Sequence, residues 1–357
     1  MPAPRSLTRQ LRDFSTHLLN AGSLLKRRTS SIGLDIGSAS IKGVKLTRTT
    51  KGLTLAEFSR VDVASDADSA RRAQAIGQVL EALDPRDSRI VTAVGGSGAV
   101  LRFVLLPKMT PQELKTALSF EVERYIPFKL DESLLDFSII EDQGGGRMKV
   151  LLAAAKTELV HSHLEFLKAA AVQVAAVDLE AVALANAWEA SFIREESPKV
   201  TGLIHVGARS TILDLFLDSQ LQFTREIPIG GEAFTQAVAK GLQMGPLQAE
   251  TVKCHPGERL GQVQTAIQPS WEEWLSQCRL SFDFYEDQSG QKIERLNLSG
   301  GSARLCGFKE WIHLATGLPT EEWNLTSGLI LEVDLKQLGL EQLCFGVAIG
   351  LAVREVS

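Results

Sequence analysis

The stretch that most constrains the fold is residues 31–46, which read S-I-G-L-D-I-G-S-A-S-I-K-G-V-K-L. Apolar residues alternate up to a D-I-G-S sequence and resume after it, which is typical of two strands joined by a tight turn. Such a turn suits a phosphate group, although a hairpin with Gly and Ser at its tip is often only a hairpin. Its candidate ligand groups are the backbone at Gly37, the donors of Ser38 and Ser40, the charge of Lys42, and Asp35 for a hydrated Mg²⁺.

A second hairpin pattern lies far downstream, at residues 203–215, and reads L-I-H-V-G-A-R-S-T-I-L-D-L. Two phosphate-binding hairpins are the signature of the actin-like ATPases, and the chain resembles that superfamily. Further blocks follow in the expected order: a connecting helix at 177–186, I-G-G-E at 229–232, A-E-T-V-K at 249–253, L-N-L-S-G-G-S-A at 296–303 and a last helix at 345–352. The resemblance implies an α/β, bilobed, actin-like (ribonuclease H-like) fold.

The resemblance also implies a site for ATP and Mg²⁺. Asp35, Gly37, Ser38, Ser40 and Lys42 would hold the phosphates, with Asp35 toward the metal. From the second half of the chain Gly207, Ala208, Gly231, Glu250, Lys253, Gly300, Gly301 and Ser302 would contact the nucleotide. Glu250 and Lys253 are three residues apart, so an ordinary surface ion pair is the alternative for these two.

His205 departs from the superfamily pattern, in which the polar residue of the second hairpin is normally an Asp that orders the Mg²⁺ water shell. Neutral imidazole prefers softer metals and does not replace an acidic group there. We therefore assign no catalytic residue and expect at most weak ATPase activity.

Residues 97–171 interrupt the first lobe. A strand at 100–106, a helix that starts at Thr110-Pro111 and continues to 126, strands at 134–140 and 148–154 and a helix at 158–170 indicate an inserted α+β module. With E-V-E-R-Y-I-P-F at 121–128 and L-L-D-F at 134–137, this SHS2-like module resembles FtsA and, more closely, the type IV pilus PilM family. The predicted parts are an extension (1–30), a first lobe (31–96 and 172–198), the module (97–171) and a second lobe (199–357) whose last helix returns to the first.

This resemblance implies a cytoplasmic ATP-binding scaffold, peripheral to the inner membrane, in a type IV pilus assembly or related secretion platform. The module would grip the cytoplasmic N-terminal tail of a PilN-like membrane protein, with nucleotide as a conformational clamp. A turnover ATPase or small-molecule kinase, and an FtsA-like polymerising division protein, are the alternatives. Self-association remains open.

Composition excludes several other classes. The net charge is −5 and there is no sustained basic stripe, so we expect no nucleic-acid partner. The four cysteines lack CxxC spacing, which argues against a disulfide framework or a zinc site. His161 and His163 diverge on a helix and are expected on a solvated face. No apolar run reaches the ~18 residues that a membrane span needs, and no signal peptide is apparent.

The N-terminal extension carries an apolar stripe with helical spacing. Leu7, Leu11, Phe14 and Leu18 fall at i, i+4, i+7 and i+11, and six Lys or Arg against one Asp make the first 28 residues basic. Two readings remain open: a helix that packs on its own protein, or a basic amphipathic helix at residues 5–28 that contacts an anionic membrane or a partner.

Two expectations concern the second lobe. Residues 255–268 contain Pro256 and Gly257, precede Pro269 and show little periodicity, which favours a loop. From Trp271 to Tyr285 apolar residues recur every three or four positions, which predicts a buried helix face.

Overall fold

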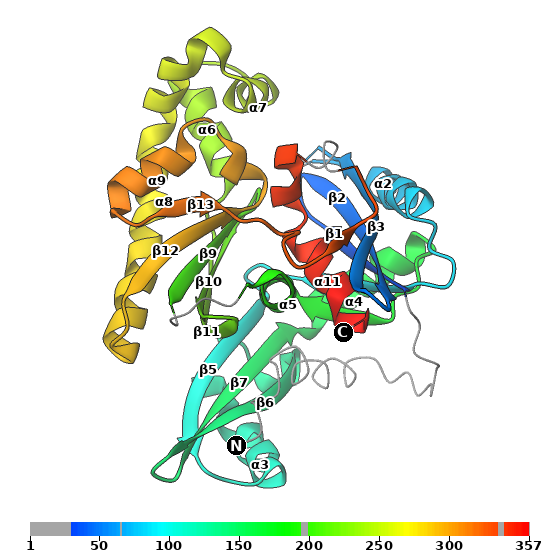
Figure 1. The fold of residues 1–357 in the computed structure, drawn as a ribbon, viewed down its shortest axis with the longest axis vertical. Coiled ribbons are helices and arrows are strands. Elements are labelled where there is room, and N and C mark those ends of the chain that lie inside the picture. Colours follow the sequence, from blue (N-terminus) through cyan, green and yellow to red (C-terminus); the bar gives the residue numbers. More distant parts are fainter. Residues whose placement is uncertain (1–29, 65, 194–198, 335–338, 357) are drawn as a thin grey trace. The chain divides into compact units, whose positions relative to one another are not determined.

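The computed structural model describes residues 30–64, 66–193, 199–334 and 339–356, so the predicted N-terminal helix lies outside the described part. The chain forms two compact units (Figure 1). Unit 1 comprises Met1–Phe192, Gly328–Leu335 and Val347–Ser357, and unit 2 comprises Ile193–Ser327 and Lys336–Gly346. The chain therefore leaves unit 1 to form unit 2 and returns to unit 1 with the last helix.

Unit 1 is built on a six-stranded sheet of order β14-β3-β2-β1-β4-β8. The strands are β1 (Ser30–Ile36), β2 (Ser40–Thr49), β3 (Gly52–Asp62), β4 (Arg89–Val94), β8 (Ala176–Leu179) and β14 (Ile330–Leu331). The predicted first hairpin is confirmed, because β1 and β2 pair antiparallel with Ile36 opposite Ile41. β14 pairs with β3 although it lies beyond residue 199. The predicted second lobe, residues 199–357, therefore includes a strand that belongs to unit 1. A strand of two residues is too short to show a sequence pattern, so this return of the chain was not predicted.

Helices cover both faces of this sheet. Ile32 and Leu34 of β1 pack with α2 (Ser69–Ala82) and with Leu167 of α4 (Thr157–Ala169). On the opposite face lie α5 (Glu180–Ser191) and α11 (Gly346–Val356). There the backbones touch: a Cβ on Gly33 of β1 would overlap the Ala348 carbonyl, and one on Gly350 would overlap the carbonyl of Ala183 in α5. Glycine at these positions lets the last helix settle against the first strand.

A separate three-stranded sheet of order β5-β7-β6 forms the inserted module: β5 (Ala99–Pro107), β6 (Ser133–Gly144) and β7 (Arg147–Lys156). Helix α3 (Pro111–Glu121) packs on one face of it through Leu114 and Leu118 (Figure 1). The predicted Thr110 capping box is present. However, α3 ends at Glu121 and passes into the 3₁₀ turn η1 (Val122–Arg124), not at 126 as predicted. Pro127 disfavours helical backbone in the residue before it, and the tighter turn pairs the last carbonyls.

Unit 2 contains a five-stranded sheet of order β11-β10-β9-β12-β13. Its strands are β9 (Val200–Val206), β10 (Thr211–Leu217), β11 (Gln220–Ile227), β12 (Ile293–Ser299) and β13 (Thr320–Glu322), and its helices are α6 (Gly231–Gly241), α7 (Pro246–Cys254), α8 (Leu260–Ser289) and α9 (Phe308–Thr316). β9 and β10 pair antiparallel, which confirms the second hairpin.

The predicted buried face of α8 is also confirmed: Trp271, Trp274 and Phe282 are buried, and both tryptophan rings pack at a tilt against Phe308. The loop predicted at 255–268 is wrong. Only a short 3₁₀ turn, η3 (Gly257–Arg259), precedes α8, which runs through Pro269 without a break. Val263 and Ile267 are buried on the same face as Trp271, so packing of that face outweighs the hydrogen bond lost at the proline.

Among the described residues, no helix is long and apolar enough to cross a membrane.

Gly350 and Gly77 provide a matched test of the backbone contact. We expect Gly350→Ala to lower the free energy of unfolding by about 3 kcal/mol, because its Cβ would overlap the Ala183 carbonyl. Gly77→Ala, in open space within α2, should raise it by roughly 0.5–1 kcal/mol through helix propensity. Urea unfolding of both variants measures this, and equal shifts in the two would contradict the contact.

Candidate nucleotide site

The first hairpin forms a small cradle in unit 1. The Lys42 ammonium lies 2.7 Å from Asp35 Oδ2, and both side chains are largely buried. A Cβ on Gly37 would stand 3.0 Å from the Ser40 carbonyl oxygen and 3.4 Å from Lys42 Nζ. Any side chain at 37 would therefore fill the space in front of the ammonium. These groups fit the phosphate and Mg²⁺ roles implied for them, since a cation and a carboxylate border an open glycine backbone.

Arg72 of α2 fixes the turn of this hairpin and was missed from the sequence. It donates to the carbonyl of Gly37 at 2.8 Å and to that of Ser38 at 3.5 Å. With the carbonyls of Gly37 and Ser38 held by Arg72, the turn has fewer acceptor groups left to face a ligand, which suits an anion. A basic residue near the start of a helix is too common to have been singled out from the sequence.

The second hairpin is similar in geometry. A Cβ on Gly207 would also stand 3.0 Å from the carbonyl oxygen three residues later, that of Ser210. Its carbonyls accept from the start of α6: Gly231 N donates to Gly207 O at 2.9 Å, and Glu232 N donates to Ala208 O at 2.7 Å. The positive end of α6 therefore supports the turn instead of facing a ligand through these two N–H groups.

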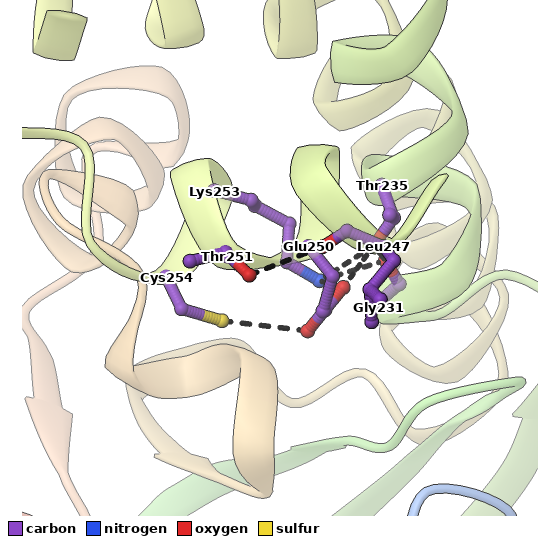
Figure 2. Close-up of polar contacts among 7 residues, drawn as sticks. All are labelled: Gly231, Thr235, Leu247, Glu250, Thr251, Lys253 and Cys254. Carbon is purple, nitrogen blue, oxygen red and sulfur yellow. Dashed lines mark hydrogen bonds and ion pairs between the residues drawn. The ribbon is translucent and has the colours of Figure 1, made fainter. Parts of the chain in front are cut away.

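Lys253 and Glu250 form the centre of the site in unit 2 (Figure 2). The Lys253 side chain is 4% exposed, and its ammonium donates to Glu250 Oε2 at 2.7 Å, Thr235 Oγ1 at 2.8 Å and Gly231 O at 3.1 Å. The alternative of an ion pair between these two residues is therefore confirmed, although Lys253 itself is buried and not on the surface. The Glu250 carboxylate remains half exposed and can meet a ligand.

The pKa of Glu250 reflects these neighbours. Burial raises it, but the charge of Lys253 and hydrogen bonds from Lys253, Thr235 and Cys254 outweigh burial, so the pKa lies below its ordinary value. Glu250 is thus a carboxylate at neutral pH.

The three residues 300–302 have different surroundings. Gly300 has φ +90°, and a Cβ there would overlap the backbone of Val206, so the fold alone explains this glycine. Gly301 faces open space, whereas a Cβ on Gly231 would meet the Ser302 hydroxyl. Gly231, Lys253 and Ser302 therefore meet within unit 2, as their joint assignment to one site requires.

His205 is held by the end of β12. The Ser299 hydroxyl donates to the Leu343 carbonyl at 3.0 Å, so it accepts from His205 Nδ1 at 3.1 Å. This assigns a hydrogen to Nδ1 and fixes the orientation of the ring. The imidazole thus stands at the position where the resemblance implies an acidic residue that would order Mg²⁺ and water.

Glu180 is a candidate that the sequence analysis missed. Strands β1, β4 and β8 are parallel, so their carboxyl ends share one edge of the sheet, where ligands bind in open α/β sheets. Asp35 lies at the end of β1, and the Glu180 carboxylate lies against Gly95, just after β4. An acidic residue directly after a buried strand was the available signal.

His163 does not lie on a solvated face as predicted. Its ring is partly buried, Nε2 lies 3.1 Å from Thr92 Oγ1, and burial lowers its pKa to about 4. The His163 side chain packs against β4 because this face of α4 points toward the sheet. In the described part of the chain, no group of three or more His, Cys, Asp or Glu side chains could hold a metal ion.

A family model described as type IV pilus assembly protein PilM matches residues 33–356. The chain belongs to the PilM family. In the solved PilM–PilN type IV pilus biogenesis complex, a chain with 28% identity superimposes with a TM-score of 0.82, covering 92% of this chain and 99% of that one. The predicted family and the α/β actin-like ATPase fold are both confirmed, and the protein is a PilM-like protein of type IV pilus assembly.

Two other similarities are more distant. The cell division protein FtsA of Bacillus subtilis (strain 168) is 31% identical over 112 residues, which are 30% of this chain and 24% of FtsA. The aligned stretch thus spans about a quarter of that relative, and it confirms the predicted relation to FtsA. MreB5 of Spiroplasma citri, solved with bound AMPPNP, has a TM-score of 0.49 and 12% identity, covering 91% of this chain and 95% of MreB5.

A Lys253→Met substitution tests whether this PilM-family lysine supports the fold as well as a ligand. We expect the unfolding free energy without nucleotide to fall by about 2 kcal/mol, because three acceptors lose a charged donor in a buried place. Thermal and urea unfolding of the ligand-free protein measure this. Unchanged stability would mean that Lys253 serves a ligand alone.

Proposed function

We propose that this PilM-family chain is an ATP-binding scaffold at the cytoplasmic side of the inner membrane, in the assembly platform of a type IV pilus. The observation that carries the nucleotide part is the cradle around Gly37, where any side chain would obstruct the space before Lys42. Bound ATP·Mg²⁺ supplies the negative phosphates and the metal charge. Lys42 and the turn N–H groups bind the phosphates, Asp35 orients the hydrated metal, and Glu250 with the backbone at Gly301 contacts the nucleoside.

Nucleotide acts in this proposal as a clamp. Candidate ligand groups lie in each unit, and bound nucleotide restrains the conformation of the chain that carries them. Turnover is slow because His205, fixed through Ser299, places an imidazole where an acidic group would position water.

The partner is a PilN-like membrane protein. Support comes from the solved complex, in which the similar PilM chain is assembled with PilN. We place the contact at the base of the module, where unit 1 has a cavity of about 20 Å³ beside the edge strand β6. Its walls are mostly apolar and come from Val94, Leu134, Leu135, Asp136, Ala153, Ala154, Ala155, Val160, Val177, Asp178 and Leu179.

The chemistry of this cavity suits an extended peptide. An edge strand offers main-chain pairing, and the apolar walls accept a small side chain. Asp136 and Asp178 add carboxylates at the same place. Burial raises the pKa of Asp178, although Arg354 at 3.6 Å acts in the opposite direction.

A turnover ATPase is a second candidate, which the position of Glu180 favours. Glu180 lies at the same edge of the sheet as Asp35, and a carboxylate at this place can orient a water molecule or accept its proton.

Nucleotide titration tests the clamp. At about 100 times its Kd, ATP·Mg²⁺ should stabilise the wild type by about 2.7 kcal/mol, seen as a rise in Tm. Phosphate release should be near background for the wild type and about 10²-fold faster for His205→Asp. No shift in Tm would refute nucleotide binding. Brisk wild-type release that Glu180→Gln abolishes would replace the clamp by the turnover ATPase.

Peptide binding tests the partner site. A synthetic peptide of the cytoplasmic tail of the PilN-like protein from the same organism is titrated against the full chain by fluorescence anisotropy. Ala153→Leu adds bulk in the cavity wall and should weaken binding about tenfold. Phe120→Ala, which removes an exposed ring on α3, should leave binding and Tm unchanged. Equal affinity of Ala153→Leu and wild type would place the contact elsewhere.

A further inference from the structure

Strand β11 forms an open edge of the unit 2 sheet. In the part of the chain that the structure describes, its only neighbour in the sheet is β10. The corresponding strand of unit 1, β3, also follows a hairpin, but there β14 covers the outer side. No described strand covers β11 in the same way. A strand at an open edge can pair through its backbone with a strand of another chain.

The regular part of this edge is short. A bulge at Gln222 interrupts the pairing with β10, and residues 223–227 beyond the bulge pair regularly. These five residues include no proline and no lysine, which are the residues that commonly block an edge. Arg225 donates to the Gln277 side chain at 3.1 Å and to Ser281 Oγ at 3.0 Å, so its charge is bound to α8. Residues 223–227 are therefore open to pairing with another strand.

An apolar patch on α8 lies beside this edge. Leu280 and Phe284 are one helical turn apart, and each is 55% exposed. The Phe284 ring centroid lies 5.8 Å from that of Phe223 in β11, whereas Arg279, on the other side of the helix, donates to the Ala315 carbonyl of α9. Leu280 and Phe284, which we call the α8 patch, therefore stand on the β11 side of the helix. Exposed apolar side chains that gather in this way mark interaction surfaces.

We propose that this edge binds the same edge of a second copy of the chain. The two β11 strands lie antiparallel about a two-fold axis at Thr224, and the two α8 patches meet on one face of the joined sheets. A two-fold contact of this kind uses the same surface of both copies, so it closes as a dimer. The pairing needs neither nucleotide nor the PilN-like partner.

The helix fits this axis. The two neighbours of Thr224 in the strand contact Phe284 and Ser281, so Thr224 lies beside the middle of the α8 patch. An antiparallel arrangement about Thr224 brings Leu280 of each copy to Phe284 of the other. Apolar side chains therefore meet apolar side chains at the centre of the contact.

The strand itself favours a second copy as the occupant. About Thr224, Phe223 of each copy lies opposite Arg225 of the other, and Glu226 lies opposite Gln222. The aromatic ring and the guanidinium attract each other, and the two threonines lie side by side. No like charges oppose each other in this register, so the edge is complementary to itself.

Charges at the ends of the helices agree with the same arrangement. Glu273 is exposed and precedes the α8 patch, whereas Lys292 follows the end of the helix and is 82% exposed beside its partner Glu286. Antiparallel helices bring Glu273 of one copy toward Lys292 of the other, so opposite charges flank the apolar centre. A contact this small is at the weak end of specific interfaces, and we expect a Kd of about 10 µM.

Sedimentation of the full-length chain without nucleotide tests the dimer. Between about 1 and 100 µM, the wild type should pass from monomer to dimer. Leu280→Glu with Phe284→Glu puts carboxylates into the centre of the contact and should raise the Kd at least about tenfold. Leu314→Glu, at an exposed leucine of α9, should leave the Kd unchanged. Because all three side chains are exposed, each variant should keep its Tm within a few degrees of wild type.

A symmetric disulfide tests the position of the axis. Thr224→Cys is made in a chain whose exposed cysteines are removed by Cys254→Ser and Cys306→Ser. Because residue 224 lies opposite itself in the dimer, oxidation should link two copies. Leu314→Cys in the same background should give several-fold less linked protein.

Three results would overturn the proposal. One is a wild type that stays monomeric at about 100 µM. Another is a dimer that Leu280→Glu with Phe284→Glu does not weaken, or that Thr224→Cys does not link. The third is a monomer in which the Thr224→Cys chain forms a disulfide with a cysteine-bearing peptide of the PilN-like tail, because the edge would then belong to that partner.

Discussion

The architecture depends on one close contact between backbones. Gly33 on the first strand and Gly350 on the last helix let α11 touch β1 and α5 without intervening side chains. Ion pairs secure the same return: Arg89 of β4 meets Glu355 at 2.6 Å, and Arg354 lies near the buried Asp178 of β8. Because the chain must come back to this contact, unit 2 has to leave and rejoin unit 1, and the returning chain also adds β14 to the edge of the sheet.

The same sheet provides the chemistry of unit 1. A hairpin at the end of β1 sets Asp35 and Lys42 beside an open glycine, and Arg72 occupies the carbonyls that would otherwise repel an anion. Unit 2 uses a second hairpin differently, because its carbonyls accept from the start of α6. In both hairpins the glycine lies three residues before the carbonyl oxygen that it approaches, so the two look alike in sequence. They differ in the group that binds the turn carbonyls, which is Arg72 in the first hairpin and the start of α6 in the second.

Structural and ligand roles overlap in the buried charges of unit 2. Lys253 binds a carbonyl, a hydroxyl and a carboxylate within its own unit, so its charge is satisfied before any ligand arrives. Glu250 keeps one side toward solvent and remains ionised. Held in this way, the Lys253 ammonium fixes the orientation of the Glu250 carboxylate. A carboxylate that is already oriented loses less conformational freedom when a ligand binds.

The sequence by itself determined the features that depend on local pattern: both hairpins, the Thr110 capping box, the buried face of α8 and the PilM family. Alternation, capping and helical spacing are written in a few neighbouring residues. Only the tertiary structure decided the rest. Helix α8 continues through Pro269 because its apolar face packs across the unit. Lys253 is buried because α7 packs against α6, and Glu180 joins the strand edge because β4 and β8 lie in parallel. Those outcomes depend on contacts between residues far apart in the chain, which a local pattern does not encode.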